Sequence, residues 1–477
     1  MPRAVGFDVL WRAAVAAAGG LAAAWAFPPY DTVWLLPIGL AAFIAATPVG
    51  RARAGFAVGL AFGLGLMLPL LRWITVIGPD AWIALSALEA AFYGLLGIGW
   101  TWVRSLRGWP LGFAACWVAA EELRSLVPFG GLPWGRLAFA LLDTPVVRYG
   151  RLGGTALVSF ATVLAVGLVV AAILRRRADT VAVAALGVAA AVVLAGMLVP
   201  VGVFGPGQLV TVAAIQGNVP GTGMNPFAER RAVLDNHVAA TRQLAADVRA
   251  GAAPRPDLVV WPENSTDIDP FGNASVRSEI DGGVRTIGVP TLVGAVIAGP
   301  DGDHLQNVGI VWDPRSGPGE RYVKRHVVPF GEYIPFRGFA TQFISRLDQI
   351  PLDFARGSSP GVLQLGPARI GDVICFEVAY DGLIRDVVAG GAQLVVVQTN
   401  NATYTGTGQL SQQFAISRYR AIETGKSVVV AATSGISGII APDGTVVASS
   451  AVGTRAILQA EVQLAAGETL GVRVGGP

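Results

Sequence analysis

The stretch "GDVICFEVAY", residues 371–380, places Cys375 and Glu377 directly after a run of apolar residues. A short apolar run of this kind is typical of a buried strand. The chain contains one other cysteine, Cys116. Buried cysteines usually serve as small core residues. Cys375 is therefore either core packing or a nucleophile, and the neighbouring motifs distinguish these interpretations.

The region around this stretch has the pattern of an α/β domain. From residue 208 on, short Val- and Ile-rich runs such as "QLVTVAAIQGN" (208–218) and "PDLVVWPEN" (256–264) alternate with helix-like stretches. This alternation indicates layered α/β structure and not a sandwich of hairpins. Active-site groups in such domains gather at strand ends. Three strand ends here carry candidate chemistry.

The first candidate is Glu263, which follows the run "DLVVW" and Pro262. Trp261 would partly shield its carboxylate from water, and desolvation raises a carboxyl pKa toward the range that suits a general base. A glutamate at a strand end is also commonly a solvated cap. This motif alone leaves both interpretations open.

The second candidate is Lys324 in "YVKRHVVPFGEYIPF", residues 322–336. The chain has 35 basic residues, and only Lys324 and Lys426 are lysines. A compact ammonium can approach a developing oxyanion, whereas the arginine fork suits carboxylate or phosphate. The alternative is a surface lysine paired with Glu332.

The third candidate is Cys375 itself, since a thiol reacts as thiolate and needs a base or a cation nearby. A Cys/His hydrolase is the rival scheme, and His326 is the one of three histidines (His237, His304 and His326) near the motifs. A Glu/Lys/Cys arrangement fits better, because each member falls at a strand end or adjoining loop. No metal-ligand spacing is present, so we expect no metal and no organic cofactor.

The first half of the chain has the composition of a membrane domain. The chain is 53% hydrophobic and 14% charged, and the apolar excess falls before about residue 205. A bilayer core about 30 Å thick needs about 20 apolar helical residues. Seven stretches qualify as expected spans: 10–27, 32–48, 55–77, 81–103, 109–127, 154–174 and 181–203.

Arginines fall at alternate connections between these stretches. They are Arg3, Arg51, Arg53, Arg104, Arg107, Arg175, Arg176 and Arg177. Arginine-bearing loops face the cytoplasm. We therefore expect a cytoplasmic amino terminus and, after an odd number of spans, an extracytoplasmic domain beyond residue 205. The connection 128–153 also carries arginines, and is either a solvated loop or an interfacial segment that meets anionic headgroups.

Carboxylates also lie in or beside the apolar stretches, at Glu89, Glu121 and Glu122. Intramembrane carboxylates are functional candidates by default. We expect these to pair with Arg124 or Arg72. Because Cys116 lies in the fifth stretch and Cys375 in the outer domain, we expect no disulfide. A free thiol in an oxidising compartment favours a chemical role for Cys375, and the net charge of +3 does not favour nucleic acid.

With these motifs in order, the sequence resembles the nitrilase, or carbon-nitrogen hydrolase, superfamily. It is most similar to the membrane-bound branch formed by the apolipoprotein N-acyltransferase family, through "WPEN", "KRHVVPFGEYIPF", "ICFE" and "TNNATY" after seven apolar stretches. The resemblance implies a transmembrane helical domain (1–204), an extracytoplasmic catalytic domain with an αββα four-layer sandwich (205–460) and a short tail (461–477).

The resemblance also implies the residue roles. Cys375 would be the nucleophile, Glu263 the general base and Lys324 the stabiliser of the tetrahedral intermediate. The supporting residues would be Glu332 and Glu377, which would orient and tune this cluster, and Phe376, near which a backbone N–H would help hold the oxyanion.

The implied enzyme is a multi-pass protein of the bacterial cytoplasmic membrane. It would move an acyl chain from a phospholipid to the α-amine of a diacylglyceryl-modified apolipoprotein through a thioester, with ping-pong kinetics. Two alternatives stay open: a membrane-tethered amidase that uses water as acceptor, and a non-catalytic scaffold with a nitrilase-like fold.

Three segments depart from the family pattern or stand outside it. Phe376 replaces a common tyrosine, and "NNATY" (400–404) replaces a more usual Asn-Asp-x-Trp-Phe stretch. The final residues "GETLGVRVGGP" (467–477) lack the family's usual eighth span. The stretch 336–361 alternates apolar residues with Gly, Ser and Pro, and is either an ordinary connection or a lid that dips into the outer leaflet.

Overall fold

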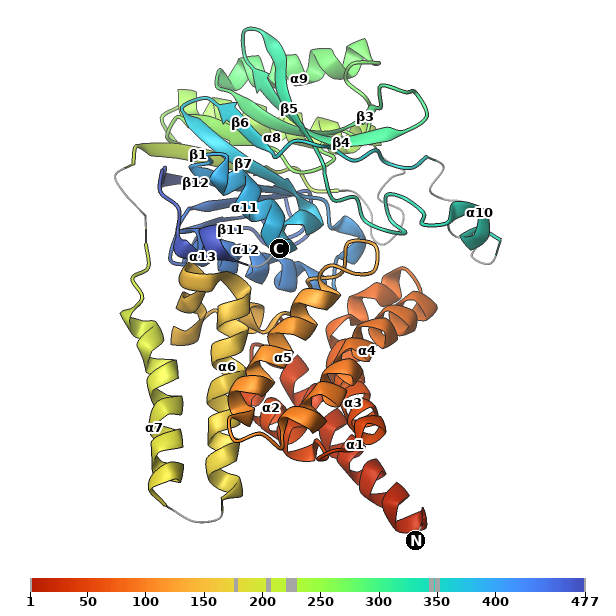
Figure 1. The fold of residues 1–477 in the computed structure, drawn as a ribbon. Coiled ribbons are helices and arrows are strands. Elements are labelled where there is room, and N and C mark those ends of the chain that lie inside the picture. The colour runs from red at the N-terminus through yellow and green to blue at the C-terminus, as the bar shows by residue number, and fades with distance from the viewer. Residues whose placement is uncertain are drawn as a thin grey trace. The chain divides into compact units, whose positions relative to one another are not determined.

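The computed structural model, drawn as a ribbon in Figure 1, describes residues 2–175, 179–202, 207–219, 230–342, 347 and 352–475. The chain divides into two compact units. The helical unit comprises Met1–Val201, Gly406–Ala415 and Val474–Pro477, and the sheet unit comprises Gly202–Thr405 and Ile416–Arg473. The described residues do not include Arg176 and Arg177. They also leave out most of 343–351, which lies within the expected lid.

The first unit is helical because its Ala- and Leu-rich runs favour helix. Glycines and prolines between these runs separate one helix from the next. α4 and α5 each begin with a proline in the first turn, where a missing N–H costs nothing. The described α-helices up to Val201 are α1 (Pro2–Ala24), α2 (Leu35–Ala46), α3 (Ala52–Leu70), α4 (Pro79–Val103), α5 (Trp109–Arg124), α6 (Gly150–Leu174) and α7 (Thr180–Ala195).

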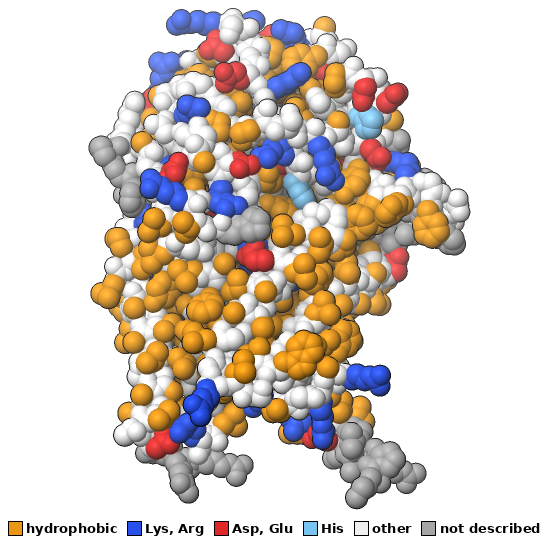
Figure 2. All heavy atoms as spheres, viewed as in Figure 1, with side chains coloured by type: hydrophobic (Ala, Val, Ile, Leu, Met, Phe, Trp, Pro, Cys, Tyr) orange, Lys and Arg blue, Asp and Glu red, His pale blue; other side chains and the backbone are white. Residues whose placement is uncertain are grey.

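Four helical segments of the described chain are long and apolar enough to cross a membrane: Ala52–Leu70, Pro79–Val103, Pro145–Leu174 and Thr180–Leu198. Figure 2 shows apolar side chains gathered over the helices of this unit. On α7, the exposed apolar side chains include Val183, Leu186 and Leu194, as expected of a surface that faces lipid. The predicted helical membrane domain is confirmed, and the count of seven spans stays a prediction.

Small residues bring α3 and α4 into close contact. Gly55, Gly59 and Gly63 recur every fourth residue along α3. A Cβ added at Gly59 would lie 2.0 Å from the carbonyl oxygen of Tyr93 in α4. Helices associate in membranes through such small-residue stripes, because close backbone approach maximises packing where the hydrophobic effect is weak.

Buried arginines form ion pairs with two of the carboxylates of the helical unit, Glu89 and Glu122. Arg124 Nη1 lies 3.1 Å from Glu89 Oε2, and both side chains are buried. Arg136 Nη2 lies 3.0 Å from Glu122 Oε2, and Arg136 is also buried. The expected pairing is confirmed for Glu89 and Arg124. Both interpretations of 128–153 are wrong for Arg136, because that connection folds back against α5 and pairs its arginine internally.

In the part of the chain that the structure describes, the sheet unit contains two six-stranded sheets. The first has the order β12-β1-β2-β3-β4-β5, formed by Ala456–Gln463, Leu209–Gln216, Leu258–Val260, Thr291–Ala298, Leu305–Asp313 and Gly317–Val323. The second has the order β11-β10-β9-β8-β7-β6, formed by Val446–Ser449, Gly438–Ile440, Val428–Ala432, Leu394–Thr399, Ala368–Ile374 and Val362–Leu365. The central strands β1-β2-β3 and β7-β8-β9 run parallel.

Two hydrophobic cores and the packing of α11 on the second sheet define four layers. One core joins the inner faces of the two sheets through residues that include Val212, Leu292, Ile370 and Val429. The other packs α8 (Arg230–Arg249) and α9 (Ala274–Ile287) on the outer face of the first sheet. Figure 1 shows α11 (Asp381–Ala389) beside the second sheet, where it contacts β7. The αββα four-layer sandwich predicted from the resemblance is confirmed.

Candidate active site

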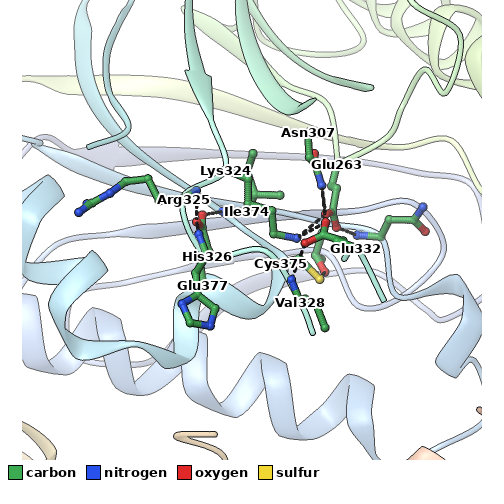
Figure 3. A network of polar contacts seen from close by, with 12 residues as sticks. Glu263, Asn307, Lys324, Arg325, His326, Val328, Glu332, Ile374, Cys375 and Glu377 are labelled. Carbon is green, nitrogen blue, oxygen red and sulfur yellow. Dashed lines mark hydrogen bonds and ion pairs between the residues drawn. The ribbon is translucent and has the colours of Figure 1, made fainter. Parts of the chain in front are cut away.

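Three strand ends bring the candidate residues together (Figure 3). Glu263 follows β2, Lys324 follows β5, and Cys375 follows β7. Lys324 Nζ lies 3.1 Å from Glu263 Oε1 and 2.8 Å from Glu332 Oε1. Glu263 is 4% exposed and Lys324 is 1% exposed. The alternatives of a solvated cap and a surface lysine are therefore wrong.

Cys375 occupies a sharp turn between β7 and the 3-10 helix η7 (Cys375–Ala379). Its backbone has a φ of +58°, which is rare for a residue with a Cβ and persists where surrounding contacts hold it. Its Sγ lies 3.3 Å from Thr399 Oγ1, at the end of the neighbouring strand β8. The turn presents the sulfur toward the side of the site that holds Glu263 and Lys324 (Figure 3).

The Glu263 carboxylate accepts three hydrogen bonds. Its Oε1 accepts from Lys324 and from Asn307 Nδ2 at 2.7 Å, and its Oε2 accepts from the Asn400 N–H at 2.7 Å. Burial alone would lower the pKa of Lys324, but Glu263 and Glu332 hold that pKa well above its ordinary value. The ammonium is therefore charged and fixed between two carboxylates.

Glu377 connects the lysine loop to the nucleophile strand. It is fully buried, and burial raises its pKa. Its carboxylate accepts from the N–H groups of Arg325 at 2.8 Å, His326 at 2.9 Å and Ile374 at 2.7 Å, and from the Tyr322 hydroxyl at 2.9 Å. These four donors place Lys324 and Cys375 in a fixed relation to each other.

His326 is not positioned to act as the base in the rival Cys/His scheme. Figure 3 shows its ring beside Glu377 and away from Cys375. The ring stacks near Tyr380, with centroids 3.8 Å apart. Burial, assisted by Arg356, lowers the pKa of His326 to about 4. A neutral ring that faces Tyr380 is packing for the loop and does not act as the base for the thiol.

Arg420 stabilises the turn that carries Cys375 by hydrogen bonds to its backbone. It is fully buried, and its guanidinium donates to the carbonyl oxygens of Val378 at 2.8 Å and Ala379 at 2.7 Å. Its charge pairs with Asp381 and Glu423, each at 2.6 Å. Sequence reasoning missed Arg420, because the carbonyls that it binds lie 41 and 42 residues away in the chain.

Asp372 is a buried carboxyl group between the two sheets. It is fully buried, and within the described part of the chain neither its oxygens nor Gln398 Oε1 has a hydrogen-bond donor. A Cβ placed on Gly309 would lie 2.1 Å from Asp372 Oδ2 and 2.6 Å from Gln398 Oε1. Burial raises the pKa of Asp372 well above its ordinary value. A proton on Asp372 would remove the charge that burial disfavours.

Asp372→Asn should retain the fold and remove a pH dependence of stability. The pKa of Asp372 is higher in the folded than in the unfolded chain, so the unfolded chain releases this proton at a lower pH. The free energy of unfolding is therefore greatest below about pH 4. Above that pH it falls by about 1.4 kcal/mol per pH unit. Asparagine cannot ionise. Thermal unfolding in detergent from pH 4 to pH 8 should show a flatter profile for the variant than for the wild type. Parallel profiles would show that Asp372 is ionised.

The four-layer sandwich with these strand-end residues defines a carbon-nitrogen hydrolase. The carbon-nitrogen hydrolase family model matches residues 211–470, and the apolipoprotein N-acyltransferase N-terminal domain model matches residues 19–168. The chain belongs to the apolipoprotein N-acyltransferase family, so the resemblance seen in the sequence is confirmed.

Named relatives cover most of the chain. The apolipoprotein N-acyltransferase of Mycolicibacterium smegmatis is 40% identical over 450 residues, which cover 89% of this chain and 75% of that protein. That of Chromobacterium violaceum is 30% identical over 491 residues, with coverages of 96% and 89%. Among solved structures, the carbon-nitrogen hydrolase of Helicobacter pylori aligns with a TM-score of 0.40 and 14% identity over 53% of this chain and 88% of that one.

Proposed function

We propose that this membrane enzyme transfers an acyl chain from a phospholipid to the α-amino group of the diacylglyceryl-modified amino-terminal cysteine of lipoproteins. The single observation that carries the proposal is the convergence of Cys375, Glu263 and Lys324 from strand ends of the two sheets in a chain of this family. The catalytic roles below are those that the geometry supports.

In the first half-reaction, Glu263 accepts the thiol proton and Cys375 Sγ attacks the ester carbonyl of the phospholipid. Lys324 and the backbone N–H of Phe376 stabilise the oxyanion. The tetrahedral intermediate collapses, the lysophospholipid oxygen takes the proton back from Glu263, and the acyl chain stays on Cys375 as a thioester. No net proton is gained or lost.

In the second half-reaction, the lipoprotein amine attacks the thioester. The oxyanion forms at the same place, Glu263 accepts the amine proton, and Cys375 leaves as thiolate and recovers that proton. An amide is more stable than a thioester, so the step runs forward without an energy source. Two substrates that use one nucleophile in turn give ping-pong kinetics.

Electrostatics explain why a base is needed. Burial, together with the charge of Glu263, raises the pKa of Cys375 to about 12. The resting sulfur is therefore a protonated thiol, protected from oxidation, and becomes nucleophilic as Glu263 removes its proton. Glu332 fixes Lys324, while Glu377 fixes the loop that carries Lys324. These supporting roles keep the ammonium within reach of the oxyanion.

We place the enzyme in the bacterial cytoplasmic membrane with its catalytic domain outside the cell's cytoplasm. The apolar helices support membrane insertion. The arginines at alternate connections support a cytoplasmic amino terminus and an extracytoplasmic sheet unit. This placement gives the active site access to exported lipoproteins and to outer-leaflet phospholipid.

The test is intact-mass spectrometry of the full chain in detergent after incubation with phospholipid. We expect an acyl-sized, hydroxylamine-labile adduct on the wild type and none on Cys375→Ala. A diacylglyceryl-modified peptide should discharge the adduct and become N-acylated, whereas the same peptide with an acetylated α-amine should not.

Two results would contradict this function. Equal discharge with both peptides, accompanied by free fatty acid, would indicate water as the acceptor. No adduct with the thiol reduced would indicate a binding role.

A further inference from the structure

The sulfur of Cys375 lies beside a cluster with net negative charge. Lys324 is the one ammonium of that cluster, and its Nζ already donates to Glu263 and Glu332. Two carboxylates against one ammonium leave a charge of −1. The titratable groups that act on the sulfur are Glu263, Lys324, Glu332 and Tyr404. A second source of stabilisation is needed when negative charge develops on the sulfur.

Thr399 supplies a neutral donor at that atom. It is the last residue of β8, which pairs in parallel with β7 beside the nucleophile. Its side chain is 1% exposed, and its Oγ1 lies 3.3 Å from Cys375 Sγ. Hydroxyl donors stabilise thiolate more than thiol, because a hydrogen bond to a charged acceptor is stronger.

The backbone on both sides of Thr399 is fixed. Its carbonyl oxygen accepts from the Thr433 N–H at 3.1 Å, and the following Asn400 N–H donates to Glu263 at 2.7 Å. Asn400, which donates to Glu263, therefore directly follows Thr399, which contacts Cys375 Sγ. Any movement of the hydroxyl relative to the sulfur would disturb the hydrogen bond that orients Glu263.

We propose that Thr399 is a further catalytic residue, whose hydroxyl donates a hydrogen bond to Cys375 Sγ as the sulfur becomes thiolate. The proposal rests on the proposed function for its place in the reaction. In the first half-reaction it stabilises the sulfur as Glu263 removes the proton. In the second it stabilises the same sulfur as the thioester carbon–sulfur bond breaks. The hydroxyl keeps its own proton throughout.

A neutral donor suits this site better than a second cation. A cation would ionise the thiol in the resting enzyme and expose it to oxidation. A hydroxyl contributes most at the moment when charge appears on the sulfur. It also adds no charge to a pocket that must bind an apolar acyl chain.

The experiment compares Thr399→Val and Thr399→Ala, which both lack the hydroxyl, with Thr399→Ser, which keeps it. Each variant is made in the full chain with Cys116→Ala, so that Cys375 is the one thiol. The readout is the rate of alkylation by iodoacetamide from pH 7 to pH 10. Below the thiol pKa this rate rises tenfold per pH unit, so a raised pKa lowers the whole profile.

We expect the Val and Ala variants to be alkylated about tenfold more slowly at each pH, which corresponds to about one pKa unit. The Ser variant should stay within about twofold of the parent. Acyl-adduct formation and discharge should both slow in the Val variant. Thermal unfolding of each variant identifies loss of fold, and the Ala variant serves where the Val variant is unstable.

Unchanged alkylation in both the Val and Ala variants would overturn the proposal. Slowing in the Ser variant as large as in the Val variant would also overturn it, because the effect would then belong to packing of the methyl group. The alkylation assay uses no lipid. Failure of the proposed function, seen as no acyl adduct on the parent, is therefore distinct from failure of this inference.

Discussion

Glu263→Gln is expected to slow acyl transfer by about 10³-fold while making Cys375 easier to ionise. Loss of a positioned general base costs about 10²–10⁴-fold in rate. The charge of Glu263 is one of the groups that raise the pKa of Cys375, so its removal lowers that pKa. The variant should therefore alkylate faster with iodoacetamide than the wild type and acylate far more slowly.

This opposite change separates two models of activation. If the enzyme relied on a standing thiolate, acylation and alkylation would rise together in Glu263→Gln. A parallel fall of both rates would show that Glu263 only supports the fold. Glu279→Gln is a matched control, because Glu279 lies in the same unit and forms ion pairs at the surface with Arg231 and Arg242. It should change neither rate.

The sequence predicted three residues that the structure brings together, because each has a local signature. Glu263, Lys324 and Cys375 follow apolar runs, and strand ends converge in a layered α/β domain. Asn307, Asn400 and Thr399 were missed. Their roles depend on which strand pairs with which, and that register is set by tertiary packing and not by neighbouring residues in the chain.

The same limit applies to the helical unit. The stretch 55–77 was expected to be one span, but α3 ends at Leu70 and a 3-10 turn, Arg72–Val76, follows. Pro69 sits in the last turn of α3, where its missing N–H removes one intrahelical hydrogen bond and weakens that turn. Composition identifies such a run as apolar but does not show where it bends. Cys116 and Cys375 are both free in the structure.

Lys324→Met is expected to destabilise the sheet unit and to slow acyl transfer by about 10²–10³-fold. Removal of one partner from a buried ion pair leaves an uncompensated charge and costs about 3–5 kcal/mol. Here two carboxylates, Glu263 and Glu332, would face each other without the ammonium between them. One of them would take up a proton, so the loss of stability should shrink as the pH falls. Thermal unfolding in detergent at pH 5 and pH 7 measures this.

The double variant Lys324→Met/Glu332→Gln separates folding from catalysis. It removes one of the two facing charges, so it should recover about half of the stability that the single variant loses, and its unfolding should depend less on pH. Activity should stay low in both, because the loss of one oxyanion donor costs about 10²–10³-fold. Recovery of acyl transfer in the double variant would show that Lys324 only neutralises the carboxylates.

Lys426→Met serves as the comparison, since Lys426 is the other lysine of the chain. Its ammonium donates to the carbonyl oxygens of Ala465 at 2.7 Å and Gly467 at 2.9 Å. Burial lowers the pKa of Lys426 to about 8. The unfolded chain therefore binds this proton more tightly, and the resulting pH dependence of stability lies above pH 8. Lys426→Met should lower stability equally at pH 5 and pH 7. A pH-dependent loss seen in Lys324→Met alone would therefore come from repulsion between Glu263 and Glu332.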